Sequence, residues 1–408
     1  MHSPISTAIR AASFPAYKSL RNWESVGSIF GVKSPFFRTI EGADGNFTTM
    51  EGQSRLNFAW CDYLGLNQHP SLAAAMKDAI DEFGPCTSAS RMVAGETPLH
   101  HALEREVAEF LGVDSALLFV SGHAANVSTI GSIMTEDDLI VHDEFVHNSA
   151  VVGMKLSRAT TMSFTHGDYD KLEAILRRER GKHRNCLVII EGLYSTEGDV
   201  TDLARAVEIK ERYGAWLMVD DAHGLGVLGK TGRGIAEHAG IDARRIDIWM
   251  GTLSKTLASC GGYIAGNKEL IDVLKHTAPG FVYSVGLLPA MTAAALAALA
   301  ALRVIKAEPE RVERLHAHGR LFLQLAKERK LNTGVCAGYG MMPVIAGDVL
   351  KAVKLWHAVY ARGINPSLIV YPGVPMKAGR LRFFLTAAHT EDQIREALDV
   401  TAEELAKL

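Results

Sequence analysis

Short apolar runs alternate with helix-like segments between residues 116 and 250. The runs are Ala116–Val120, Leu139–His142, Leu187–Glu191, Trp216–Asp220 and Ile246–Met250. Runs of this length with few polar residues are typical of strands that are buried on both faces of a sheet. Because helical segments separate them, the strands are expected to run parallel. The pattern therefore predicts an α/β fold with a mostly parallel sheet.

The pattern changes after the alanine-rich segment Leu287–Ile305. The sequence beyond it predicts strands at Gly340–Ile345, Leu368–Val370 and Leu381–Leu385, and helices at Arg311–Lys330, Leu350–Arg362 and Thr390–Ala406. Strands and helices in this mixture indicate a smaller C-terminal α+β domain.

The first 50 or so residues show little periodicity. We expect an N-terminal arm with a short helix within Thr7–Gly27, and a strand and turn at Asn57–Leu66 that enter the main fold. The expected division is an N-terminal arm at residues 1–55, a large domain at 56–290 and a small domain at 291–408.

The composition is that of a globular protein, with 408 residues, 48% hydrophobic and 22% charged. A net charge of −3 gives no reason to expect nucleic acid or an anionic membrane surface as partner. Five cysteines without CxxC spacing fit reduced thiols in a cytoplasm better than disulfides or a zinc site, and no metal is expected. The alanines of Leu287–Ile305 are too weakly apolar for a membrane span, so this segment predicts a buried helix.

The most informative motif follows the last of the apolar runs. Thr252 and Ser254 precede Lys255, and a glycine pair follows at 261–262. A lysine at the end of a buried strand has little room to be a solvated surface charge. Hydroxyl groups beside it are suited to bind a phosphate. The motif predicts a lysine held for imine chemistry beside an anion site.

Other polar residues lie where the predicted strands end. Glu191 ends one strand, and Asp220 and His223 follow the next. Gly122 and His123 open a helix after a third strand, and a helix N-terminus attracts anions. Ligands bind beyond the carboxyl ends of an open parallel sheet. Each residue alone is more often a cap, a turn or a structural group, but their joint placement predicts one pocket.

Three motifs together resemble the α-oxoamine synthase family of pyridoxal-phosphate enzymes, which have fold type I. They are Asp220-Asp-Ala-His223-Gly-Leu-Gly, Gly229-Lys-Thr-Gly-Arg-Gly234 and Gly251-Thr-Leu-Ser-Lys255. The family includes serine palmitoyltransferase, 8-amino-7-oxononanoate synthase, 5-aminolevulinate synthase and glycine C-acetyltransferase. The resemblance extends from Asn57-Phe to Ala387-Ala-His-Thr. It implies pyridoxal 5'-phosphate as cofactor and a homodimer with shared active sites.

The resemblance also implies roles for individual residues. Lys255 would bind the cofactor aldehyde and then act as the base at the substrate Cα. Asp220 would pair with the ring nitrogen, and this charge-assisted bond makes the ring a stronger electron sink. His147 would stack on the ring, and His223 would hydrogen-bond the ring hydroxyl. Ser195 matches another residue of the cofactor pocket.

The phosphate of the cofactor is expected to have several ligands. By the resemblance, Gly122, His123, Thr252 and Ser254 would hold it. Ser284 lies in a segment that matches one reaching the phosphate across a dimer interface in the family. We therefore expect Ser284 to serve the partner's site.

The substrate pocket is where the sequence departs from family members. Arg382 matches the arginine that grips the substrate carboxylate, and a planar guanidinium suits that group; its alternative role is a salt bridge at a strand end. Cys61 stands where several members have asparagine and serine palmitoyltransferase-like members have tyrosine, and a thiol is a poor hydrogen-bond partner. Cys61 and Ser90 are expected to border the amino-acid pocket. The segment Ser88–His100 looks closer to the synthases found beside polyketide or fatty-acid assembly lines, and the resemblance as a whole implies a serine palmitoyltransferase-like or polyketide-associated member.

The resemblance implies a decarboxylative Claisen condensation. A small α-amino acid (serine, alanine or glycine) would join an acyl thioester, carried on coenzyme A or an acyl carrier protein, to give an α-aminoketone, carbon dioxide and free thiol. One alternative is an aminotransferase, aldolase or racemase on the same fold. A second is a non-catalytic partner subunit, which the presence of Lys255 makes improbable. The amino acid and the acyl chain are not identified by the sequence.

Overall fold

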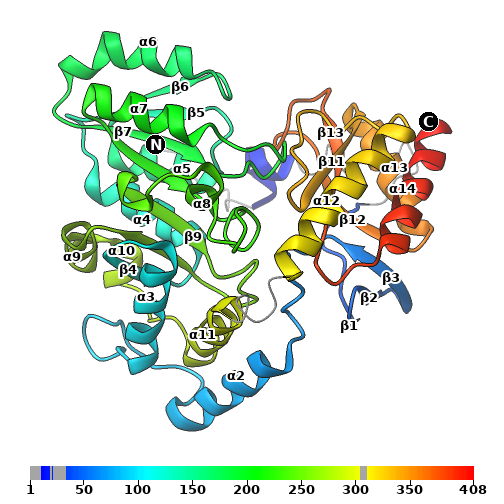
Figure 1. Ribbon diagram of the computed structural model, residues 1–408, viewed down its shortest axis with the longest axis horizontal. Helices are drawn as coiled ribbons and strands as arrows, with labels where there is room; N and C mark the ends of the chain where they lie inside the picture. Colours follow the sequence, from blue (N-terminus) through cyan, green and yellow to red (C-terminus); the bar gives the residue numbers. More distant parts are fainter. Residues whose placement is uncertain (1–10, 19–20, 22–33, 304–309) are drawn as a thin grey trace, which may run out of the picture.

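The computed structural model describes residues 11–18, 21, 34–303 and 310–408 of the chain. Two lobes make up the molecule (Figure 1). The larger lobe contains a seven-stranded sheet with the strand order β4-β10-β9-β8-β7-β5-β6. Its strands are β4 (Ser115–Phe119), β5 (Leu139–Asp143), β6 (Thr160–Phe164), β7 (Cys186–Glu191), β8 (Trp216–Asp220), β9 (Ile248–Thr252) and β10 (Gly262–Gly266).

Strands β5 to β9 are parallel, and β10 is antiparallel to both of its neighbours. The prediction of a mostly parallel α/β sheet is therefore confirmed. Successive side chains point to opposite faces of a strand, so in β8 Leu217 and Val219 join one apolar cluster and Met218 joins the other. All six residues of β7 are buried, because the sheet packs on both faces.

Helices connect or follow these strands, and several of them begin at polar caps. They are α4 (Gly122–Ile133), α5 (Asn148–Ser157), α6 (Tyr169–Glu179), α7 (Leu203–Tyr213), α8 (Ile235–Ala239), α9 (Lys268–Thr277) and α10 (Pro279–Val282). Asp168 caps α6 and Asp202 caps α7 by accepting the backbone N–H of the third following residue. Ser121 caps α4 in the same way. This cap places the start of α4 directly after β4.

The smaller lobe is built on a six-stranded sheet with the order β1-β2-β3-β12-β13-β11. Its strands are β1 (Gly42–Asp44), β2 (Phe47–Met50), β3 (Gln53–Phe58), β11 (Met341–Gly347), β12 (Ile364–Ile369) and β13 (Gly379–Phe384). Three helices accompany them: α12 (Glu310–Glu328), α13 (Val349–Ala361) and α14 (Glu391–Ala406). These C-terminal elements lie where the sequence predicts them.

The N-terminal strands belong to the small lobe. β3 pairs in parallel with β12, so that Asn57 lies opposite Asn365. The strand expected to enter the main fold instead completes the C-terminal sheet. The sequence gives no local signal of this pairing, because the partner strand lies some 300 residues away. After β3 the chain passes to the large lobe, where it forms α2 (Pro70–Phe83) and α3 (Pro98–Leu111). Of the short helix expected within Thr7–Gly27, the described residues show a 3-10 helix at Ala11–Ser13 and helical residues at 15–18, and the rest of the range is mostly outside the described residues.

The alanine-rich segment forms α11 (Pro289–Arg303). This helix packs against α2 and α3, and Ala294, Ala295 and Ala298 are fully buried. Small side chains allow such close helix packing. In the described part of the chain, no helix combines the length and apolarity that crossing a membrane requires.

A buried histidine ties the first strands of the small lobe to its C-terminal end. His389 Nδ1 accepts the Thr386 backbone N–H at 2.9 Å, and Nε2 lies 3.2 Å from the carbonyl oxygen of Asn57. The ring stacks on Phe58 with a centroid distance of 4.3 Å. Nδ1 is occupied as an acceptor, so the ring is neutral. Burial lowers the pKa of His389 to about 3.

This histidine predicts a specific loss of stability in mild acid. The unfolded chain binds the proton near pH 6.5, whereas the folded protein binds it only near pH 3. Stability is therefore full above pH 6.5 and falls with decreasing pH, by about 1.4 kcal/mol per pH unit at most for this group. Denaturant unfolding at pH 7 and pH 5 measures the loss, which we expect to be smaller in His389→Gln than in the unmodified protein. Equal losses in the two proteins would contradict this account.

Candidate active site

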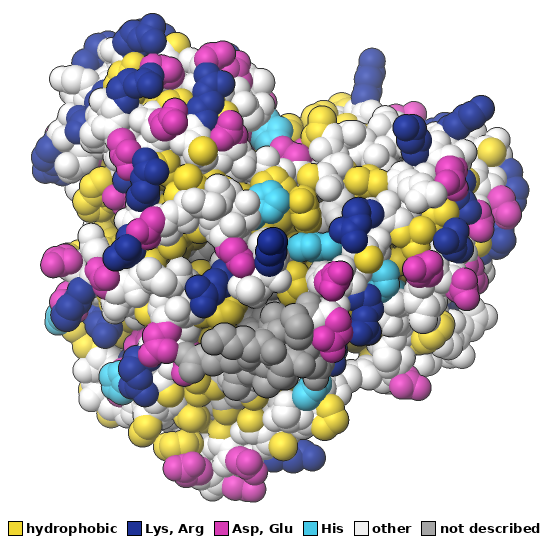
Figure 2. Space-filling view, in the orientation of Figure 1, with side chains coloured by type: hydrophobic (Ala, Val, Ile, Leu, Met, Phe, Trp, Pro, Cys, Tyr) yellow, Lys and Arg dark blue, Asp and Glu magenta, His cyan; other side chains and the backbone are white. Residues whose placement is uncertain are grey.

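Strands β7, β8 and β9 end side by side at one edge of the large sheet. Glu191 lies opposite Asp220 in the ladder, and Asp220 lies opposite Met250. The strand-end residues predicted from the sequence therefore meet at this edge. On the face shown in Figure 2, histidine side chains gather along the boundary between the two lobes.

Asp220 is held in a fixed orientation by groups from two elements. Its Oδ2 accepts a hydrogen bond of 2.9 Å from Asn126 Nδ2 on α4, and its Oδ1 accepts one of 3.1 Å from the backbone of Ala222. Asn126 Nδ2 also donates to Ser149 Oγ at 2.9 Å. Asp220 itself is only 8% exposed. A carboxylate fixed in this way can direct a negative charge at a ligand without rearranging.

His147 caps α5 and borders the same space. Its Nδ1 lies 2.6 Å from Ser149 Oγ and accepts the Ser149 backbone N–H. Partial burial lowers the pKa of His147; Asp220 opposes this effect, and Lys255 and His123 add to it. The side chain is otherwise exposed, which leaves a face of the ring free to pack on a flat ligand.

Lys255 follows β9 and points into the site among charged groups. Burial lowers the pKa of Lys255, although Cys61, Asp220 and Glu191 act in the opposite direction. A lowered pKa increases the fraction of the neutral amine near pH 7. That form is the one that acts as a nucleophile or a base.

His223 follows β8 and contacts a tyrosine from the N-terminal part of the chain. Tyr63 Oη lies 2.6 Å from His223 Nδ1, and both side chains are buried. Burial, with Lys255 and Arg382 nearby, holds the pKa of His223 well below its usual value, so the ring is neutral. When Tyr63 donates to Nδ1, the proton of the ring resides on Nε2. His223 then offers an N–H donor to the site.

Hydroxyls and the start of α4 form a small polar cradle. Thr252 Oγ1 and Ser254 Oγ lie 2.8 Å apart. A Cβ added to Gly122, the first residue of α4, would lie 3.3 Å from Thr252 Oγ1. His123 follows in the same turn. A helix N-terminus beside two hydroxyls is suited to bind an anion such as phosphate.

Glycine at position 262 permits this arrangement. A Cβ there would lie 2.5 Å from Gly122 Cα and 2.6 Å from Gly122 N. Such distances are too short for any side chain, so only glycine lets β10 pass this close to the start of α4. The glycine pair after the lysine motif thus has a packing role.

Arg382, on β13 of the small lobe, also belongs to the site. Its Nη1 donates to the Ser195 carbonyl oxygen at 2.6 Å, and its guanidinium lies 4.6 Å from the centre of the Phe384 ring. Arg382 Nε is buried without a hydrogen-bond partner among the described residues. The remaining donors suit a carboxylate ligand.

Cys61 lies beside these cations, since Lys255 and Arg382 both lower its pKa. Burial is the larger effect and raises the pKa of the Cys61 thiol, so the thiol is protonated near neutral pH. Ser90 and Ser284 lie in two segments that contact each other, because the Gly286 N–H donates to the Ala89 carbonyl oxygen. Their predicted roles toward the cofactor and substrate stay predictions.

Two residues of the site were not singled out from the sequence. Tyr63 and Asn126 orient His223 and Asp220 from positions 160 and 94 residues away. Glu191, which the sequence predicts as part of the strand-end pocket, is 4% exposed and its Oε1 has no partner among the described residues. Burial and Asp220 hold the pKa of Glu191 well above its usual range, which favours its neutral form. The distance along the chain explains why periodicity could not find the first two.

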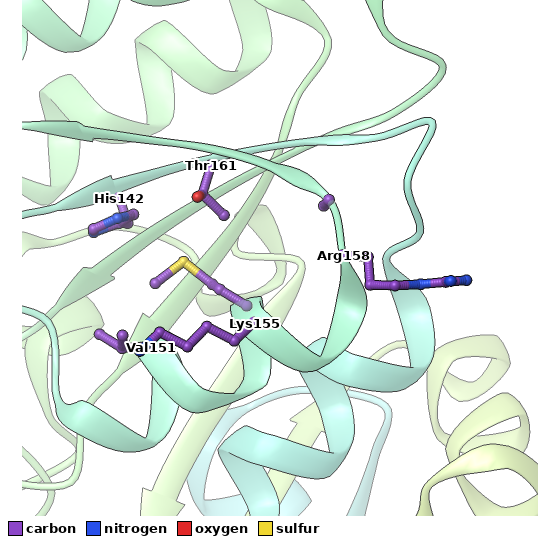
Figure 3. Close-up of a pocket in the computed structure, with 7 residues that line it drawn as sticks. His142, Val151, Lys155, Arg158 and Thr161 are labelled. Carbon is purple, nitrogen blue, oxygen red and sulfur yellow. The ribbon is translucent and has the colours of Figure 1, made fainter. Parts of the chain in front are cut away.

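A separate hollow of about 260 Å³ lies between α5 and the start of the β5–β6 pair (Figure 3). It is lined by His142, Val151, Met154, Lys155, Arg158, Ala159 and Thr161. None of the predicted site residues lines it. The Arg158 guanidinium already pairs with Glu136, so the hollow does not resemble a prepared site.

The amino-acid sequence is similar to a known family over most of its length. The profile of the family described as "Aminotransferase class I and II" matches residues 54–400. The 8-amino-7-oxononanoate synthase of Bacillus pumilus is 36% identical over 374 residues, which cover 91% of this chain and 93% of that protein. The enzyme of the same name from Fervidobacterium nodosum is 38% identical over 365 residues, covering 89% and 91%.

Solved structures resemble the fold over nearly its whole length. Serine palmitoyltransferase from Sphingomonas wittichii has a TM-score of 0.91 at 27% identity, covering 97% of this chain and 98% of that one. An 8-amino-7-oxononanoate synthase from Francisella tularensis has a TM-score of 0.75 at 26% identity, covering 86% and 98%.

The glycine contact yields a test of the cradle. In Gly262→Ala the new methyl group must displace the start of α4, and we expect a loss of about 1–3 kcal/mol in the free energy of unfolding. Gly181→Ala is a matched control, because a Cβ there meets nothing within 4 Å. Denaturant unfolding of the two variants measures the difference. If Gly262→Ala is as stable as Gly181→Ala, the close approach is not a constraint.

Proposed function

The chain belongs to the class I and II aminotransferase family, as one of its α-oxoamine synthases, and we propose that it condenses a small α-amino acid with an acyl thioester. In this reaction the amino-acid Cα forms a bond to the acyl carbon and the thiol leaves. The carboxylate departs as carbon dioxide, and a proton replaces it, giving an α-aminoketone. The observation that carries the proposal is Lys255, with a lowered pKa, between Asp220 and Arg382.

The residues present fit pyridoxal 5'-phosphate, the cofactor of this family. Thr252, Ser254 and the start of α4 form a cradle of the right chemistry for its phosphate. Asp220, fixed by two hydrogen bonds, suits a protonated ring nitrogen. Lys255 is suited to its aldehyde. When bound, the cofactor supplies an aldehyde that joins amines and a ring that delocalises the electron pair left at Cα.

The chain's own groups then perform four tasks. Arg382 binds the carboxylate of the amino acid with the donors that Ser195 leaves free. Lys255 Nζ, when neutral, takes the proton from Cα. Asp220 presents its negative charge to the ring nitrogen, and His223 presents its Nε2–H to the ring hydroxyl. Because these groups are oriented before substrate binds, little reorganisation is needed during the reaction.

The exposed ring of His147 completes the cofactor site by packing on the flat ring, and His123 adds a donor near the phosphate. Ser195 lines the pocket from the loop after β7. Ser284 serves the site of a second subunit in a homodimer, and Ser90 and Cys61 border the amino acid. These assignments rest on the placement of the residues and on the family resemblance. We also propose the division into arm, large and small domains, with the strands at 42–58 packed on the small domain.

The names of the relatives indicate different amino-acid substrates. An 8-amino-7-oxononanoate carries its amine on a carbon next to a terminal methyl group, which corresponds to alanine, whereas serine palmitoyltransferase names serine. We therefore propose alanine, serine or glycine for this chain, with an acyl thioester on coenzyme A or a carrier protein. We also propose that the enzyme acts in the cytoplasm. The half-buried, protonated Cys61 favours an amino acid with a small side chain, because a thiol offers a weak hydrogen bond.

Product analysis tests the reaction class. With pyridoxal phosphate, each amino acid labelled at its carboxyl carbon and a series of acyl-CoA lengths, we expect labelled carbon dioxide and free thiol in equal amounts. Lys255→Ala should abolish both products, while Lys327→Ala, on the exposed face of α12, should retain them. An enzyme blank is needed because Cys86 and Cys260 are exposed and react with thiol reagents. A keto acid formed without thiol would show an aminotransferase instead.

Arg382 allows the amino-acid site to be tested separately. In Arg382→Lys, loss of the planar fork should raise the KM for the amino acid about tenfold or more, with the KM for the acyl thioester little changed. Arg380→Lys is the control, since Arg380 pairs with Glu197 and the Thr196 carbonyl oxygen. Steady-state kinetics with each substrate varied in turn gives both constants. A selective rise in the KM for the thioester would remove Arg382 from the carboxylate site.

A further inference from the structure

His166 lies in the loop between β6 and α6, and its ring is held on two sides. Nδ1 lies 3.0 and 3.1 Å from the carboxylate oxygens of Asp143, and Nε2 lies 3.0 Å from Asp199 Oδ2. Carboxylates only accept hydrogen bonds, so both nitrogens donate and the ring carries a positive charge. Burial alone would lower the pKa of His166, but the two carboxylates raise it to about 10.

Two aromatic rings hold the same imidazole by packing. Phe145 stacks on it with centroids 4.6 Å apart and an interplanar angle of 27°. Tyr194 meets it edge-on at 4.4 Å. Phe145 follows Asp143 in the loop after β5, and Tyr194 belongs with Asp199 to the loop after β7. Each of the two loops therefore contacts His166 with one carboxylate and one aromatic ring.

The first of these loops carries His147. Asp143 Oδ1 accepts the Phe145 backbone N–H at 2.8 Å, and Asp143 Oδ2 accepts that of Gly167 at 3.0 Å. His147 comes four residues after Asp143, at the cap of α5. The position of the Asp143 carboxylate therefore sets where the loop turns and where the His147 ring lies.

The second loop carries Ser195. Tyr194 N–H donates to the Asp199 carbonyl oxygen at 3.0 Å, and Gly198 N–H donates to the Tyr194 carbonyl oxygen at 2.9 Å. These bonds close a tight turn around Ser195, whose carbonyl oxygen holds Arg382. The Asp199 carboxylate, fixed by His166, thus lies at the base of the turn that positions the carboxylate-binding arginine.

We propose that His166 is a positioning residue: as an imidazolium between Asp143 and Asp199, it fixes the loops that carry His147 and Ser195. Through them it orders the cofactor face and the anchor of Arg382. The proposal rests on the proposed function only in taking these loops to flank pyridoxal phosphate and the amino acid. The Glu191 carboxyl group lies close to the backbone of both loops, since the backbone N–H groups of Ser195 and His147 lower its pKa against the larger effect of burial.

Cofactor affinity of the apoprotein is the test, because it is measured without turnover. In His166→Gln the two carboxylates lose their shared cation and the loops separate. We expect the Kd for pyridoxal phosphate, followed by fluorescence, to rise about tenfold or more, and kcat to fall with a changed KM for the amino acid. Adding Asp199→Asn removes the uncompensated charge and should recover part of the cofactor affinity.

Lys210→Met is the matched control. Lys210 is as buried as a site residue and pairs with Asp247 at 3.0 Å, near the amino ends of β8 and β9. It should lower the thermal midpoint without changing the Kd for the cofactor. If His166→Gln does not fold, Asp199→Ala replaces it, with a weakened cofactor affinity again expected.

Wild-type affinity in the folded variant, or an equal loss of affinity in Lys210→Met, would overturn the positioning role. A weakened Kd in a protein that forms no aminoketone would instead refute the proposed function and leave the role of His166 standing. The two failures are therefore distinguishable.

Discussion

The parallel register of β7 and β8 is the constraint on which the site depends. It places Glu191 directly opposite Asp220, so two buried acids lie side by side in a region of low polarity. Burial and the neighbouring Asp220 raise the pKa of Glu191 and favour its neutral form. One negative charge is then left to Asp220, where Asn126 Nδ2 and the Ala222 N–H orient it. Lys255 lies near enough to Asp220 for that charge to raise its pKa against the larger effect of burial.

The sequence predicted those parts of the fold and site that leave a local signal. Each buried strand, the strand-end Asp220 and the lysine motif can be recognised from residues within a few positions of it. The reaction class followed from the resemblance of these motifs to a family. Tyr63 and Asn126 left no such signal, because each acts on a residue about a hundred or more positions away. Their roles became visible only once the chain was folded.

The same limit explains why the sequence did not indicate that β3 belongs to the small lobe. The strands at 341–384 were predicted because strand and helix patterns alternate there. β3 was expected to enter the main fold, but it pairs with β12 across more than 300 residues. Parallel pairing needs no turn between its strands, so nothing in the intervening sequence indicates it. His389 completes the junction by contacting Phe58 and the Asn57 carbonyl oxygen.

The two lobes meet through two arginine side chains of β13. From β13, Arg380 pairs with Glu197 at 2.8 Å, and Arg382 donates to the Ser195 carbonyl oxygen at 2.6 Å. Both partners lie in the turn after β7, on the large lobe. In the proposed role of Arg382, a bound carboxylate would be held between a strand of one lobe and a loop of the other. Because His166 fixes the base of that loop through Asp199, the geometry at the amino acid depends on a charge that never touches it.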